Sequence, residues 1–113
     1  MAAIRRRFEG ADWHFKIRLT KNGSPYDFSA ATTVTAATIN EDTGIVVGPE
    51  TQSNGGDSDW ANGIIDITFP KIATNGTATT TTGNEHSLRL RIDDDEIEIF
   101  RKQLVVAAGY LVP

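Results

Sequence analysis

The chain has 113 residues, the length of one domain, and its formal net charge at pH 7 is −4. It contains no cysteine, which excludes disulfide bonds, cysteine-ligated metals and thiol nucleophiles. The acidic balance argues against nucleic acid as a partner, because phosphate binding needs clustered lysine and arginine. No apolar run approaches the roughly 20 residues that cross a bilayer, so no membrane partner is expected.

The first predicted strand covers residues 13–20, where apolar residues occupy every second position. They are Trp13, Phe15, Ile17 and Leu19. Strict alternation is the signature of a strand with one face in a core and the other in water. The segment 21–25 follows, and its Asn22-Gly23 pair favours the positive φ of a tight turn.

The middle of the chain alternates short strands with polar loops. Strands are predicted over 33–40 and 45–47, with a turn at 41–44 between them. Residues 48–63 are rich in Gly, Asn, Asp and Ser and have no periodicity, which is typical of a loop. Residues 64–69 alternate again and end at Pro70, which cannot donate to a strand ladder. The threonine-rich segment 71–84 is predicted as a loop.

The last third predicts a hairpin, with strands over 87–92 and 96–100 and a turn at 93–95. Arg89 and Arg91 are expected to face Glu96 and Glu98 across it. A final strand is predicted over 103–106. About seven short antiparallel strands at these spacings predict an all-β fold, a single immunoglobulin-like β-sandwich that occupies residues 1–113. A short N-terminal arm (1–7) and an apolar C-terminal tail (107–113) flank it.

No residue pattern of an assembled active site is present. His14 and His86 lack the ligand spacing of a metal site. The run at 93–96 is interpreted as a solvated turn rather than a calcium site, and Asp57 and Asp59 lack the distal ligands of a calcium loop. No Gly-x-Ser-x-Gly elbow and no phosphate-binding glycine loop occurs. We therefore expect no catalytic residue, no metal and no cofactor.

The candidate interface residues lie in three places. Trp60 stands in the long polar loop, where it either stacks on a sugar or a protein surface or folds back as a lid on the core. Arg5, Arg6 and Arg7 form a short basic patch, interpreted as a protein contact or a solvated run. In the tail, Tyr110, Leu111 and Val112 are too few to fold alone and suit insertion into a partner, for instance at a sheet edge.

The order of these features resembles a known family. The stretch Phe8-Glu9-Gly10-Ala11-Asp12 leads into the amphipathic strand 13–19, and a turn then carries Asn22-Gly23-Ser24-Pro25-Tyr26-Asp27-Phe28-Ser29. Near the end, residues 83–92 precede a hairpin and a closing Leu104-Val105-Val106. This arrangement resembles the small β-sandwich domains of tailed-bacteriophage virions, above all the N-terminal domain of baseplate upper proteins and related tail or fibre attachment domains. The chain departs from that pattern at 85–87, where the family has a tyrosine after glycine, and at 71–84, where relatives carry a short helical turn.

The resemblance implies a structural protein of the tail or baseplate region that docks on other virion proteins, with no catalytic residues. It also implies assembly in the host bacterial cytoplasm and homo-oligomerisation in the particle. A capsid decoration or head-fibre protein is the nearest alternative. A carbohydrate-binding module with Trp60 as its platform is the alternative from another class, and an enzyme is the reading with least support.

Overall fold

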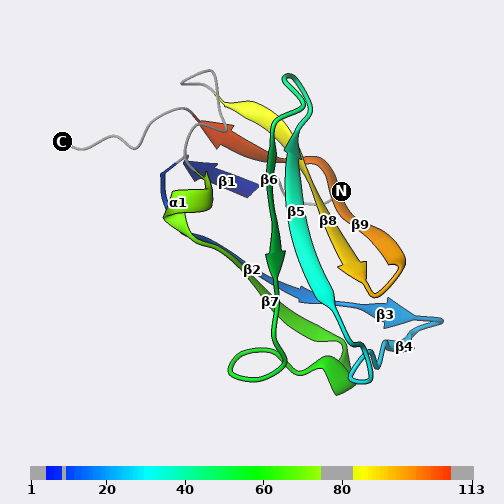
Figure 1. Ribbon diagram of the computed structural model, residues 1–113. Coiled ribbons are helices and arrows are strands. Elements are labelled where there is room, and N and C mark those ends of the chain that lie inside the picture. The colour runs from blue at the N-terminus through cyan, green and yellow to red at the C-terminus, as the bar shows by residue number, and fades with distance from the viewer. Residues whose placement is uncertain (1–4, 9, 75–82, 108–113) are drawn as a thin grey trace.

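A computed structural model describes residues 5–8, 10–74 and 83–107, which form a sandwich of β-strands (Figure 1). The larger layer is a five-stranded sheet in the order β1-β9-β8-β5-β6. Its strands are β1 (Arg5–Phe8), β5 (Val34–Asn40), β6 (Val46–Thr51), β8 (Asn84–Ile92) and β9 (Asp95–Ala107). The smaller layer pairs β2 (Trp13–Arg18) with β7 (Ile64–Phe69), and a hairpin of β3 (Thr20–Lys21) and β4 (Ser24–Pro25) follows β2.

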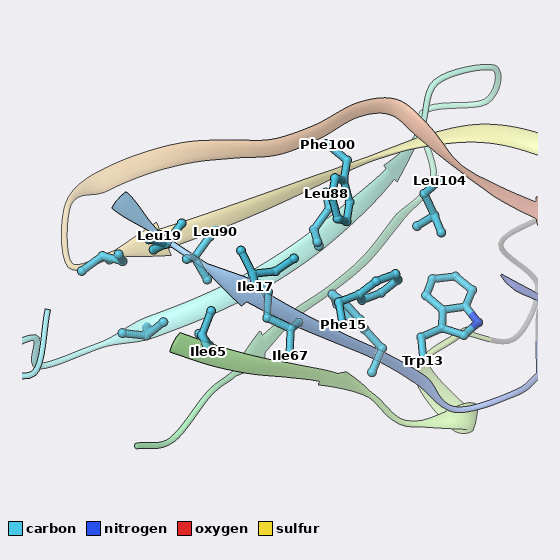
Figure 2. Close-up of a cluster of buried hydrophobic side chains, with 14 of the residues drawn as sticks. Trp13, Phe15, Ile17, Leu19, Ile65, Ile67, Leu88, Leu90, Phe100 and Leu104 are labelled. Carbon is cyan, nitrogen blue, oxygen red and sulfur yellow. The ribbon is translucent and has the colours of Figure 1, made fainter. Parts of the chain in front are cut away.

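The core lies between the two layers because the alternating strands turn their apolar residues inward. In β2 every second residue is buried, as the sequence pattern predicts. Figure 2 shows side chains from β2 and β7 meeting those from β8 and β9. Aromatic rings join the layers edge to face, with Phe15 and Phe100 6.0 Å apart between ring centroids. The predicted all-β sandwich is thus confirmed.

The predicted antiparallel pairing holds everywhere except at one edge. Nine strands are present in the described part of the chain, rather than about seven, and β1 pairs with β9 in parallel. Arg5 aligns with Leu104 and Phe8 with Ala107. The prediction of an N-terminal arm over 1–7 is therefore wrong for residues 5–7, because the end of β9 offers a backbone edge on which they form a strand.

Three segment boundaries also differ from the prediction. The strand β6 takes residues 48–51 out of the predicted loop, and within 71–84 the residues Lys71–Thr74 form a short helix, α1. The two predicted C-terminal strands are one strand, β9. It continues through 101–102 because a bulge absorbs the break in alternation: Lys102 takes φ 57°, and its N–H donates to Ser87 Oγ at 3.0 Å.

The turns follow their local chemistry. Asn22 and Gly23 adopt φ values of 55° and 80°, the left-handed pair that joins β3 to β4. Asp93, with φ 52°, opens the turn between β8 and β9. Its Oδ1 accepts the N–H groups of Thr32 and Thr33, both at 2.9 Å. The acidic turn therefore also fixes the chain that enters β5.

Candidate functional site

Trp60 closes one end of the core. Its ring stacks on Phe28, with centroids 5.1 Å apart and planes at 27°, and the residue is 6% exposed. The backbone holds it there, since Phe28 N–H donates to the Trp60 carbonyl at 3.1 Å and Asn54 Oδ1 accepts the Trp60 N–H at 3.2 Å. Of the two predicted alternatives, the lid on the core is the one observed, and the indole face is not available to a sugar ring.

The long loop carries Trp60 inward because its polar groups bond back to the smaller layer. Ser58 Oγ accepts the Asp66 N–H at 2.9 Å, and Gln52 Oε1 accepts the Thr68 N–H at 3.2 Å. A 3-10 turn, η1 (Trp60–Asn62), then ends at Gly63, which has φ 74°. A Cβ at this glycine would fall on the carbonyl oxygen of Leu19, so the loop can pass this close only with glycine there.

The predicted basic patch, Arg5 to Arg7, also contacts the rest of the fold through Arg7. The Arg7 guanidinium lies 4.6 Å from the centre of the Phe15 ring and donates to the His14 carbonyl oxygen at 2.9 Å. Arg6 is exposed, and the backbone of Arg5 belongs to β1. Arg6 and Arg7 therefore do not form a joint patch, because successive strand residues point to opposite faces.

The two histidines occupy opposite environments and do not meet. His14 lies on the exposed face of β2, where its Nδ1 is 3.3 Å from Thr68 Oγ1. His86 is fully buried in β8, edge to face with Trp13, and neither ring nitrogen has a hydrogen-bond partner. Burial lowers the pKa of His86 to about 4, against the opposing effect of the Asp42 and Glu41 carboxylates. The predicted strand began at Ser87, three residues after the observed start of β8 at Asn84, and so left His86 outside the predicted core.

Metal binding has no candidate in the described ranges. No group of three or more histidine and carboxylate side chains converges there, whether at 93–96 or around Asp57 and Asp59. Asp59 instead accepts a hydrogen bond from the Asn62 amide at 2.7 Å. Among the same residues, no helix is long and apolar enough to cross a membrane.

The outer face of the larger sheet carries a hollow of about 210 Å³. Its titratable residues are Arg89, Arg91 and Glu96, and Arg89 and Glu96 form an exposed ion pair at 3.6 Å. The predicted cross-strand pairing is confirmed in the register, where Arg89 faces Glu98 and Arg91 faces Glu96.

Exposed apolar side chains mark a different kind of site. The large ones in the described residues are Phe8 at 41%, Ile45 at 41% and Val46 at 52% exposure. Phe8 ends β1 and Val46 begins β6, and these are the two edge strands of the larger sheet. These residues are not among the interface residues that the sequence predicts. The signal was the apolar pair Ile45-Val46 directly after the turn that ends at Gly44.

The predicted interface residues Tyr110, Leu111 and Val112 lie outside the described residues. Of the predicted tail 107–113, Ala107 belongs to β9. No protein-family model and no curated protein matches this chain. The resemblance to phage virion domains therefore remains a prediction from the residues that carry it.

Proposed function

We propose that this chain is a structural docking module of a tailed-bacteriophage virion, which binds neighbouring subunits in the tail or baseplate region. The observation that supports docking is the location of the exposed apolar side chains: Phe8 and Val46 lie on the two edge strands of the larger sheet, and Ile45 directly precedes Val46. Edge strands that display apolar residues are normally covered, since they otherwise template uncontrolled pairing. The virion setting rests on the sequence resemblance.

The other candidate residues support a binding role rather than catalysis. The side chains of Trp60 and His86 are buried in the core, and the charged residues that line the hollow on the outer face are Arg89, Arg91 and Glu96. A capsid decoration or head-fibre protein would use the same edges. The carbohydrate-binding alternative loses its platform because the Trp60 ring stacks on Phe28.

The test is incorporation of a tagged chain into tailed-phage particles that form in the organism carrying its gene. Purified particles should contain the tagged protein. Replacing Ile45 and Val46 together by serine should lower incorporation about tenfold, because two apolar side chains lose their buried contact. The matched control is Thr20→Ser, an exposed change outside these edges, which should incorporate like the wild type.

Particles that lack the protein would overturn the virion assignment. Light scattering of the free protein at several concentrations separates two forms of docking. A defined trimer or hexamer indicates self-assembly before incorporation, whereas a monomer indicates that docking needs a different subunit.

A further inference from the structure

Within the described part of the chain, the smaller layer of the sandwich leaves one long edge of β2 without a strand beside it. β2 pairs with β7 from Trp13 opposite Phe69 to Arg18 opposite Ile64, and no other described strand joins this sheet. The opposing layer has five strands. A layer of two strands facing a layer of five has room for an added strand, and an open strand edge is where an extended peptide adds.

The backbone groups of this edge point outward at alternate residues. Leu19 N–H donates at 2.7 Å to the carbonyl of Gly63, the residue just before β7. The carbonyl oxygen of His14 points the opposite way, toward the open edge of β2, where it accepts a hydrogen bond from the Arg7 guanidinium. Because antiparallel residues alternate between facing the neighbour and facing away, the N–H and C=O groups of Lys16 and Arg18 face the open edge.

The side chains of the same residues make the edge positive. We define the β2 stripe as Lys16 and Arg18, which lie on the exposed face and flank a hollow of about 150 Å³ lined also by Ile17 and Ile64. Neither residue takes part in the ion pairs of the described chain, Arg89–Glu96 and Arg101–Glu98. Asp66 stands opposite Lys16 in the register without forming an ion pair with it.

We propose that the open edge of β2 binds an extended acidic segment of a partner protein as a third strand, with the partner's carboxylates on the β2 stripe. This inference deepens the proposed docking function and rests on it. Backbone pairing supplies the affinity and the stripe supplies the charge complementarity that selects the partner.

Two other occupants fit the edge less well. A second copy that paired β2 with β2 would bring the two stripes against each other, and like charges on neighbouring strands are destabilising. A nucleic acid does not use the backbone groups of a strand edge, and the net charge of −4 opposes its approach.

The experiment uses the intact chain and a short synthetic peptide that alternates glutamate and valine. Amide hydrogen exchange is followed by NMR with and without the peptide. The Lys16 and Arg18 amides should gain protection as the peptide binds with a Kd below about 1 mM. A peptide with alternate backbone nitrogens methylated should fail to bind, because it cannot pair with the edge. A peptide with lysine in place of glutamate should also fail.

Variants separate charge from backbone pairing. Lys16→Gln and Arg18→Gln should each lower peptide affinity about fivefold, which corresponds to one partly exposed charge contact. The matched control, Lys21→Gln in the β3–β4 hairpin, should change it less than about twofold. Thermal unfolding of each variant checks that the fold is kept.

Three results with the peptide would overturn the inference: unchanged exchange at Lys16 and Arg18 with the peptide at about 1 mM, equal binding of the methylated peptide, or displacement of the peptide by a single-stranded oligonucleotide. Protection of the Lys16 and Arg18 amides that grows with protein concentration in the absence of peptide would also overturn it, in favour of a second copy. Incorporation of the chain into particles distinguishes failure of this inference from failure of the proposed function. If incorporation persists while the peptide test fails, the proposed function stands and the β2 edge is not its docking site.

Discussion

The buried histidine makes the stability of this fold sensitive to acid. His86 has a pKa of about 4 in the folded protein and an ordinary value of 6.5. The unfolded chain therefore binds the proton more readily, and stability is fully present above about pH 6.5 and falls as the pH drops toward the folded value. Relative to neutral pH, protonation of His86 lowers the free energy of unfolding by about 2 kcal/mol at roughly pH 5 and by about 3 kcal/mol at roughly pH 4.

The perturbation that isolates this effect is His86→Leu, which keeps a side chain of similar volume and removes the titration. Because neither ring nitrogen has a partner, the leucine variant should be as stable as the wild type at neutral pH, or more stable by about 1–3 kcal/mol. Urea unfolding at a series of pH values measures the stability of both proteins at neutral pH and the change in that stability with pH. Between about pH 7 and pH 4, the wild type should lose about 3 kcal/mol more than the variant.

The control is His14→Gln, which alters the exposed histidine and should keep the wild-type pH dependence. The comparison stays above about pH 4 because the hydrogen bonds from Ser29 hold the pKa of Asp27 below its usual range, and that contribution is lost in stronger acid. If His86→Leu keeps the full acid sensitivity, the burial argument is refuted. If the variant is strongly destabilised at neutral pH, the ring makes hydrogen bonds that the structure does not contain.

Three further changes test the packing of the site. Trp60→Ala should cost about 3–5 kcal/mol in urea unfolding, because the ring that closes the core on Phe28 is removed; a loss below about 1 kcal/mol would mean that Trp60 is not a lid. Gly63→Ala should lower the melting temperature far more than Gly23→Ala, since both have positive φ but only the first meets backbone atoms; equal effects would contradict the close approach. Arg89→Ala should lower the free energy of unfolding by less than about 1 kcal/mol, because its ion pair is exposed; a larger loss would show that the hollow on the outer face of the larger sheet is structurally important.

Local pattern was sufficient wherever one strand face met water and the other met the core. The alternation over 13–19 and 64–69 predicted β2 and β7, and Ile64–Phe69 matches the predicted bounds. Asn22-Gly23 predicted its turn for the same reason, since a positive φ is a property of those two residues rather than of their surroundings. The all-β class followed from these segments together.

Positions that depend on a distant segment were not predictable from local pattern. Arg5–Phe8 is a strand because β9 passes beside it. Trp60 is buried, although it belongs to a polar loop, because its ring stacks on Phe28. The open edge of β2 could not be predicted either, because the sequence of a strand does not specify how many strands pair with it. The sequence by itself determined which residues alternate and where the chain turns. The tertiary structure alone decided which strands pair, which polar side chains the core encloses and which edges stay open, because each of these depends on contacts between residues far apart in the chain.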